Sequence, residues 1–420
     1  MLTEDYKVAR LTEFTYTVTV VSSGGNKYAI NGNTQQYVIL FPGSTYKFDQ
    51  ADSSNNGHPL RFSETSNGTH NSGSEYTTGV TTAGTPGNSG AYTQIEVTSS
   101  TPFVLYYYCT NHSGMGGEIN IPPNMATPGD RALNAGGESP ATSNIDYLTI
   151  STTGNATKFG DLIIASFDGI NCVGGKTRGF FGGGAQPSGW SDRVMVVDFA
   201  SKGNCSDFNN LTEARRDVTA TGNSIKGIFA GGSNPSNAVT NTIQQFIQSS
   251  LGNCIDFGDL TISVKRCAPS QSSTRGLIGG GDTGSATNVI GYITFTTQGN
   301  ATDFGDLTTA TNYLGGNSNS TRGLFGGGNT GSVTNTITYV TIASTGNSTD
   351  FGDLTQARQG SNGASNATRC VFMSGQTPTA VNTIDYVTIG STGDASDFGD
   401  LSYSTTSGGG GNSNGHGGLQ

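Results

Sequence analysis

Three side chains that bind soft metal ions lie on one short loop. Residues 105–117 read LYYYCTNHSGMGG, so that Cys109, His112 and Met115 are spaced three residues apart. The whole chain has only four histidines and six cysteines. A cysteine thiolate, two imidazoles and a weak axial thioether form the ligand set of a blue-copper site. This loop offers three of those four ligands.

The second imidazole has to come from an earlier loop. His58, in NNGHPLRF, follows a predicted strand and precedes a strand-like pattern of apolar residues at Leu60 and Phe62. We expect the fold to bring His58 to the loop at Cys109. A plainer interpretation stays open, in which the loop serves packing only and binds no metal. His70 lies in the long polar stretch 64–90 and is expected to be a solvated loop residue.

Residues 15–121 supply the strands that would position these ligands. Alternating or apolar runs separated by Gly, Pro and Asn predict a small β-sandwich. The predicted strands are FTYTVTVV, KYAIN, YVILF, STYKFDQAD, AYTQIEVT and PFVLYYYC. Residues 1–14 are an N-terminal extension, and the Pro-rich stretch 122–130 is a linker to a second domain, 131–420.

The second domain is a set of repeats. The block FGDL begins at Phe159, Phe257, Phe304, Phe351 and Phe398, with FNNL at Phe208, so copies lie 47 to 49 residues apart. A basic residue followed by Gly and two apolar residues recurs with the same period. The six units begin at residues 131, 178, 226, 275, 322 and 369.

An all-strand repeat of this length predicts the blades of a β-propeller, because one small sheet cannot bury both of its faces alone. A partial seventh copy, HGGLQ, begins at His416. We expect these last residues to add a strand to the first blade and close a six-bladed ring. Five or seven blades, or an open stack, remain alternatives.

The repeats also pair an acidic with a basic residue. Asp259, Asp306 and Asp353 each precede an arginine by 16 positions, and the unit with Asn210 in place of Asp carries Lys226 in place of Arg. Bidentate pairing of carboxylate and guanidinium would explain this joint change. We therefore expect an ion pair within each blade; a basic ring that binds an anion is the alternative.

Both halves of the chain resemble known families. The double glycines and strand tyrosines, as in Gly326, Gly327 and Tyr339, resemble kelch repeats, although Phe replaces the usual Trp and the single Trp190 lies in a loop. The wording TGNATDFGDLT…STRGLFGGG resembles repeats in structural proteins of marine tailed phages.

The first domain resembles cupredoxins. The C-x2-H-x2-M spacing is similar to the ligand loop of amicyanin-like members, and MGGEINI is similar to their closing strand. The resemblance implies a type 1 copper site with His58 and His112 as imidazole ligands, Cys109 as thiolate and Met115 as axial thioether. The polar insertion at 64–90 departs from the family pattern.

Charge, the N-terminal sequence and the cysteine pattern limit the classes of partner and the compartment that we expect for the chain. The formal net charge of −10 argues against binding of the nucleic acid backbone, which needs a basic face. The start MLTEDYKVARLTEF lacks the features of a signal peptide, and the sequence has no apolar run long enough for a membrane span. Without a CxxC pattern, the cysteines are expected to be free thiols in a reducing compartment, with a Cys205–Cys254 bridge as the less favoured alternative.

These features predict an all-β protein, a cupredoxin-like sandwich followed by a kelch-like six-bladed propeller. The function they favour is that of a phage virion structural protein, an exposed tail or capsid appendage assembled in the host cytoplasm. Its expected partners are other virion proteins, a host-surface receptor or glycan, and further copies of itself. A copper electron-transfer protein with a propeller interaction domain is the alternative. No catalytic residues and no enzyme activity are expected, because GxSxG, HExxH and P-loop patterns are missing from the sequence.

Overall fold

The chain divides into two compact units, residues 1–127 and 128–420. Strands and three short 3-10 helices are the regular elements of the described part, which confirms the all-β class. No helix there is long and apolar enough to cross a bilayer. The computed structural model describes residues 13–40, 44–98, 101–102, 104–121, 129–138, 141–166, 168–187, 189–406 and 409–420.

The division at 127/128 falls within the stretch predicted as a linker, of which residues 122–128 lie outside the described part. Residues 1–12 of the predicted extension also lie outside it. Glu13 and Phe14 are not part of an extension, because they open the first strand and pair with Thr45 and Tyr46. The alternating apolar pattern therefore begins two residues earlier than predicted.

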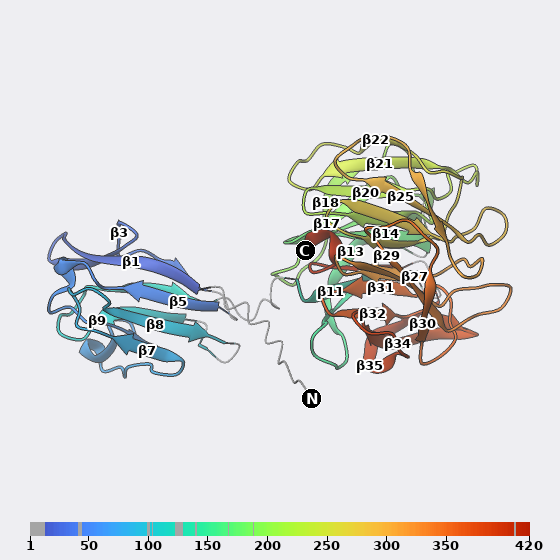
Figure 1. Ribbon diagram of the computed structural model, residues 1–420. Helices are drawn as coiled ribbons and strands as arrows, with labels where there is room; N and C mark the ends of the chain where they lie inside the picture. The colour runs from blue at the N-terminus through green and yellow to red at the C-terminus, as the bar shows by residue number, and fades with distance from the viewer. Residues whose placement is uncertain are drawn as a thin grey trace, which may run out of the picture. The chain divides into compact units, whose positions relative to one another are not determined.

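The first unit contains two sheets, with strand orders β3-β2-β1-β5-β8-β7 and β4-β10-β9-β6 (Figure 1). Their pairings are antiparallel except for β1 with β5 and β4 with β10. The strands are β1 Glu13–Ser22, β2 Asn26–Ile30, β3 Asn33–Thr34, β4 Val38–Ile39, β5 Ser44–Asp49, β6 Leu60–Ser63, β7 Val80–Ala83, β8 Tyr92–Val97, β9 Val104–Cys109 and β10 Gly117–Asn120.

Both sheets of the first unit contribute to one hydrophobic core. Val18 and Phe48 enter it from one sheet, Phe62 and Leu105 from the other, and all four side chains are fully buried. The strand expected over YVILF is reduced to β4, and residues 41–43 and 103 lie outside the described part. The short strand β7 within the polar stretch 64–90 was not expected, because its sequence VTTA shows no clear apolar pattern. Its side chains are exposed or half-buried.

Six further sheets make up the described part of the second unit (Figure 1). Each is antiparallel, with its four main strands in sequence order, except that the last strand of the chain joins the first sheet. The short strands β16 and β33 pair with β15 and β34 beside the main order. The strands are β36 Gly410–Ser413, β11 Arg131–Ala135, β12 Thr142–Thr149 and β13 Thr157–Ser166; β14 Asp168–Gly174, β15 Arg178–Gln186, β16 Gly189–Trp190, β17 Arg193–Asp198 and β18 Ser206–Asn210; β19 Thr219–Gly222, β20 Lys226–Ala230, β21 Thr242–Ile247 and β22 Ile255–Asp259; β23 Ala268–Gln271, β24 Arg275–Gly279, β25 Val289–Thr294 and β26 Thr302–Asp306; β27 Gly315–Ser318, β28 Arg322–Gly326, β29 Thr336–Thr341 and β30 Thr349–Asp353; β31 Asn362–Ser365, β32 Arg369–Met373, β33 Gln376–Thr377, β34 Thr379–Thr388 and β35 Ser396–Thr405.

Neighbouring sheets of the second unit share two recurrent contacts. Their first strands touch in the order β36, β14, β19, β23, β27, β31 and again β36. A backbone N–H just before each fourth strand also donates to a carbonyl within the previous sheet's fourth strand. These bonds, 2.7 to 2.8 Å long, are Cys205 to Asp161, Cys254 to Asn210, Ala301 to Asp259, Ser348 to Asp306, Ala395 to Asp353 and Ala156 to Asp400. The sixth and first sheets therefore meet as the other pairs do.

The first strands meet through buried polar side chains. Asn317 donates to the carbonyl of Gly363 and to the side-chain oxygen of Asn412, both at 3.2 Å. Asn412 in turn donates to the carbonyl of Cys172 at 3.1 Å. Gln271 donates to Asn317 at 2.7 Å. These three amides are fully buried, and each amide nitrogen has a hydrogen-bond acceptor. Together they join strands of five sheets.

The strand that the chain's end adds to the first sheet is β36, which pairs with β11. The prediction placed this strand at HGGLQ, whereas residues 410–413 form it and Gly417–Leu419 form a 3-10 turn. The difference arises because each sheet begins one strand earlier than the basic-Gly block that marked the repeat. The added strand is therefore the equivalent of β31, not of β32.

The predicted Asp–Arg ion pairs are wrong, since no ion pair in the described residues joins these partners. Arg275, Arg322 and Arg369 instead lie over the rings of Tyr292, Tyr339 and Tyr386 at 4.7 to 4.8 Å. Each guanidinium also donates to a backbone carbonyl of the next sheet: Arg275 to Ile342, Arg322 to Ile389 and Arg369 to Ile150. The arginines thus join sheets rather than carboxylates.

The unit that has lysine in place of arginine lacks this stacking on tyrosine. Gln245 in β21 occupies the place of Tyr292 in β25, so the third sheet lacks the tyrosine ring. Lys226 lies over Phe257 instead, at 5.6 Å. Loss of the ring alone does not account for the lysine, because Val196 holds the tyrosine position of the second sheet and the residue at the start of β15 is still Arg178.

We expect the second unit to lose stability in mild acid because of His416. Its imidazole is fully buried, donates from Nε2 to the Gly174 carbonyl at 2.8 Å and accepts the Gly418 N–H at Nδ1 at 3.1 Å. Burial lowers the pKa of His416 to about 4. The unfolded chain takes up this proton near pH 6.5, so stability is complete above that pH and falls by up to about 3 kcal/mol towards pH 4.

Urea unfolding of the wild type and of His416→Gln across pH 4 to 7 measures this effect. Glutamine can donate and accept but does not titrate, so the stability difference between the two proteins should shrink or reverse in acid. The pKa of Asp168 is raised to about 6 by burial, which favours the folded state in acid, and this opposite effect cancels in the comparison. A difference that is independent of pH would contradict the assignment.

Candidate metal centre

Strand pairing brings His58 next to Cys109. β6 and β9 pair so that Leu60 lies opposite Cys109, and the N–H of Thr110 donates to the Pro59 carbonyl at 3.2 Å. His58 precedes β6 by two residues and therefore lies at the same end of the sheet as the ligand loop. The two predicted ligands, distant in sequence, meet because of this register.

The ligand atoms of His58, Cys109 and His112 lie within 4.8 Å of one another. Cys109 Sγ is 3.8 Å from Nδ1 of His58 and 3.7 Å from Nδ1 of His112. A metal bound at 120° with bonds of about 2.3 Å to sulfur and about 2.0 Å to nitrogen would separate these atoms by about 3.7 Å. The donor set therefore fits a trigonal Cys-His-His site.

His58 is held through its backbone carbonyl. The hydroxyl of Tyr28 donates to this oxygen at 2.7 Å and the side-chain amide of Gln50 at 2.9 Å. Burial, with a smaller effect of His112 nearby, lowers the pKa of His58. This shift favours the neutral imidazole, which is the form that binds a metal.

The second ring nitrogen of His58 faces an amide. Nε2 lies 3.5 Å from the side-chain amide group of Asn26. If Nδ1 binds a metal, Nε2 carries the proton and needs an acceptor, which the Asn26 oxygen supplies after a half-turn of the amide. Asn26 is therefore suited to orient the ring, a role that sequence spacing did not indicate.

Met115 and His112 differ in their exposure to solvent. His112 is exposed, whereas Met115 is 1% exposed and belongs to the same core as Cys109. The carbonyl of Met115 accepts the Tyr28 N–H at 2.9 Å. This places a buried thioether three residues after one ligand, while its role as axial ligand stays a prediction.

Side chains from three other segments fix the ligand loop. Asn67 accepts the N–H of Gly114 at 2.7 Å, and Lys27 donates to the carbonyl of Gly114 at 2.5 Å. Gln35 donates to the carbonyl of Gly116 at 2.6 Å. A Cβ at Gly116 would lie 1.6 Å from the Tyr107 carbonyl oxygen, so the loop needs glycine here to fold back on β9.

His70 is exposed to solvent, as predicted, but it also contacts the candidate centre, which the prediction did not include. Although the residue is exposed overall, its Nε2 donates to the backbone carbonyl of Cys109 at 2.9 Å, and its ring meets Tyr108 edge-on at 6.5 Å. His70 lies in a 3-10 helix, η2 Gly68–Asn71. The polar insertion 64–90 therefore folds over the candidate centre and supports it through Asn67 and His70.

The other cysteines take no part in the centre. All six are free, so no Cys205–Cys254 bridge forms. Burial raises the pKa of Cys205, Cys254 and Cys267 to about 12, which keeps these thiols protonated. They act as small apolar side chains between sheets.

No protein-family model matches the chain, and no curated protein matches it.

Proposed function

We propose that the second unit is a kelch-like β-propeller with six blades in a closed ring. The observation that supports closure is the contact between the sixth and first sheets, where the Ala156–Asp400 bond and the Arg369–Ile150 bond repeat the contacts of the other sheets. The pairing of β36 with β11 joins the two ends of the repeat region in one blade.

The first unit is a cupredoxin-like domain that binds one copper ion. The donor set supports this proposal, because a thiolate and two imidazoles at these separations suit copper, and a buried thioether lies on the same loop. Residues His58, Cys109 and His112 would hold the ion, with Met115 as axial ligand. Copper bound there supplies a one-electron redox couple.

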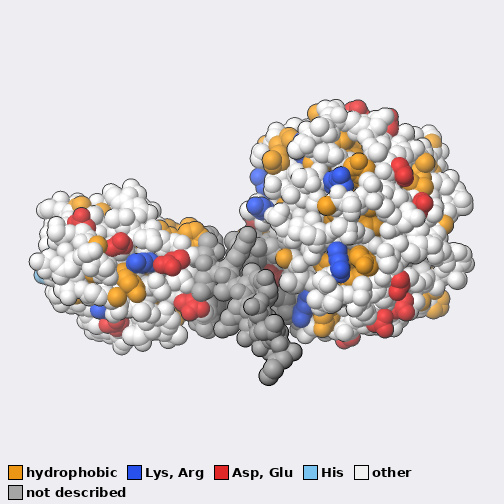
Figure 2. All heavy atoms as spheres, in the orientation of Figure 1, with side chains coloured by type: hydrophobic (Ala, Val, Ile, Leu, Met, Phe, Trp, Pro, Cys, Tyr) orange, Lys and Arg blue, Asp and Glu red, His pale blue; other side chains and the backbone are white. Residues whose placement is uncertain are grey.

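The whole chain is a structural protein of a phage particle, an exposed tail or capsid appendage that displays a binding surface. The resemblance of the repeat sequence to repeats of phage structural proteins supports this proposal. A rigid ring whose blades carry loops of different sequence at equivalent places supports it too. Two such connections are the one between β15 and β17, which contains β16, and the one between β20 and β21. On the face of the second unit drawn in Figure 2, basic and acidic side chains are scattered among uncharged ones. Such a surface suits hydrogen bonding to a host receptor or glycan.

A copper electron-transfer protein is the second candidate. The exposure of His112, with Cys109 buried behind it, favours this function because an exposed ligand imidazole offers an electron a short path to a partner. Reversible reduction of the loaded protein by a small redox protein would support electron transfer. The propeller would then be the partner-binding domain.

Mass spectrometry of particles purified from the phage that encodes the chain tests the proposed function. The chain should be present at a constant copy number relative to the major capsid protein after gradient purification and a salt wash. Antibody labelling in the electron microscope should place it on the particle surface. Its presence in the lysate but not in particles would overturn the proposal.

A further inference from the structure

The repeats allow equivalent places between neighbouring sheets to be compared. Arg358 follows the FGDL block of the fifth sheet by four residues and is fully buried against the sixth sheet. Its Nη1 lies 3.0 Å from the carboxylate of Asp385, and its Nη2 donates to the Phe372 carbonyl at 3.1 Å. Thr355 donates to the same carboxylate from its N–H and its hydroxyl. This interface is filled.

The second and third sheets fill the same place in a similar way. Arg215, the equivalent of Arg358, is 3% exposed and donates to the carbonyls of Gly231 and Thr242. Gln244, the equivalent of Asp385, accepts the N–H of Thr212 at 2.7 Å. A guanidinium and a polar partner thus occupy both interfaces.

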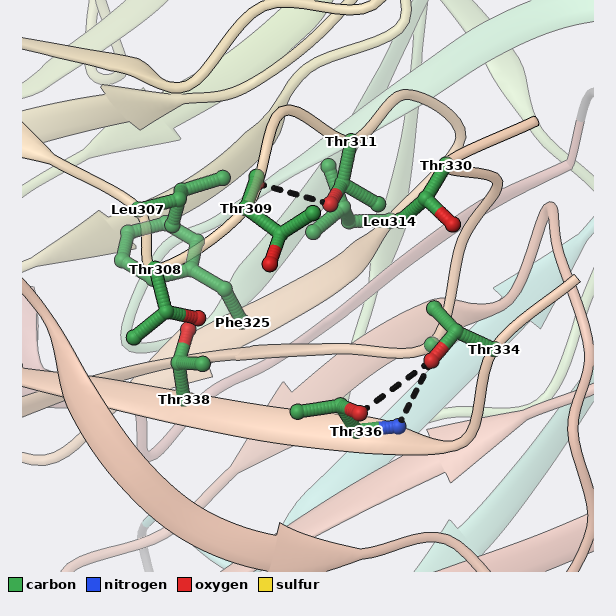
Figure 3. A pocket seen from close by; sticks show the side chains of 11 residues that line it. Leu307, Thr308, Thr309, Thr311, Leu314, Phe325, Thr330, Thr334, Thr336 and Thr338 are labelled. Atoms are coloured by element: carbon green, nitrogen blue, oxygen red, sulfur yellow. Dashed lines mark hydrogen bonds between the residues drawn. The ribbon is translucent and has the colours of Figure 1, made fainter. Parts of the chain in front are cut away.

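Threonines replace both members of the pair between the fourth and fifth sheets. Thr311 stands in place of Arg358, and Thr338 in place of Asp385. The shorter side chains leave a cavity of about 50 Å³, shown in Figure 3. Thr311 bonds to the Thr309 carbonyl at 2.9 Å, whereas the hydroxyl of Thr338, 5% exposed, has no partner.

The lining of this cavity selects an uncharged, amphipathic group. Leu307, Leu314 and Phe325 form an apolar wall, and the remaining lining residues are threonines and one glycine. None of them is charged. A cation in the position of the neighbouring guanidinium would have no carboxylate partner here, which burial makes costly. The volume also exceeds what one water needs.

We propose that this cavity binds the acetamido group of an N-acetylhexosamine. The group is planar like the guanidinium next door, carries a methyl for the apolar wall, and offers a carbonyl and an N–H to threonine hydroxyls such as that of Thr338. The identity of the glycan as a host-surface ligand rests on the proposed function; the site itself does not.

The cavity mouth favours a sugar over an acetylated lysine. Thr308, Thr309 and Thr330 line it and are exposed (Figure 3). Their hydroxyls can bond to the ring hydroxyls of a sugar. The aliphatic stem of acetyl-lysine would need apolar walls at the same place.

Saturation-transfer NMR on the full chain with N-acetylglucosamine, glucose and Nε-acetyl-lysine tests the proposal. N-acetylglucosamine should bind, with the strongest transfer at its acetyl methyl, and glucose should not. Thr338→Val should weaken binding about fivefold, the worth of one hydrogen bond. The same change should not lower stability, because it removes a buried hydroxyl without a partner. Thr311→Arg with Thr338→Asp rebuilds the neighbouring ion pair and should abolish binding.

Thr302→Asp serves as the control, because it places a charge on an exposed position of β26 outside the cavity. It should leave binding unchanged. Binding that persists in the folded double variant, or no binding of N-acetylglucosamine by the wild type, would overturn the proposal. Binding of acetyl-lysine alone would overturn the sugar assignment. A chain that binds the sugar but is missing from particles would refute the virion function and leave this site intact.

Discussion

Deletion of residues 410–420 is expected to abolish cooperative unfolding of the second unit. The deletion removes β36, which pairs with β11 over Ala132–Ala135 and touches β14 and β31. It also removes one of the two acceptors of the fully buried Asn317 amide. Several hydrogen bonds at about 1 kcal/mol each, together with the buried area, match the total stability of a domain. Calorimetry should show the loss of one of two transitions.

Two controls make this result specific. Removal of Gln420 alone takes away one bond to the Ser320 N–H and one to the Gly415 carbonyl, and should lower the melting temperature by only a few degrees. A synthetic peptide of residues 409–420, added in trans, should restore the transition. A truncated chain that still unfolds cooperatively at the wild-type temperature would show that the ring does not depend on its last strand.

Replacement of Cys109 by serine is expected to eliminate the blue absorption that cupric ion should give with the wild type. The thiolate is the donor responsible for this colour in type 1 sites, and a hydroxyl does not replace it. Because serine is close to cysteine in size, the buried site should stay folded. Absorption and equilibrium dialysis across a copper titration measure the change, with an expected affinity loss of at least about a hundredfold.

Cys205→Ser is the matched control, because this half-buried free thiol lies in the second unit, outside the ligand cluster. It should keep the full absorption. Retention of the colour by Cys109→Ser, or its loss in Cys205→Ser, would refute the assignment of the thiolate. Circular dichroism of both variants shows whether a change of colour reflects the ligand or the fold.

The order of the sheets and the number of residues in each could be predicted, because the same sequence pattern recurs in every repeat. Each copy of FGDL and of the basic-Gly block marks one strand. Since apolar residues within the repeat do not recur at helical spacing, strands are the regular element that the repeat predicts. The limits of each sheet could not be read in the same way. The first strands, such as GGNS in β27 and APSQ in β23, are short and polar, because they bury amides and hydroxyls instead of apolar side chains.

The candidate site was predictable to the extent that its ligands are local. Cys109, His112 and Met115 share one loop, and His58 needed only one strand pairing. Supporting contacts come from Asn67, His70 and other polar residues whose spacing carries no periodic signal. The partners of the repeat arginines were misjudged for a related reason. A cation can be satisfied by a carbonyl and a tyrosine ring as well as by a carboxylate, and sequence alone does not distinguish these.

X-ray absorption spectroscopy of the copper-loaded protein tests the central claim most directly, namely that folding gathers His58, Cys109 and His112 into one metal centre. The protein should bind one equivalent of copper, with one sulfur and two imidazole nitrogens in the first coordination sphere. A spectrum with nitrogen and oxygen neighbours only, or a stoichiometry well below one, would contradict the claim.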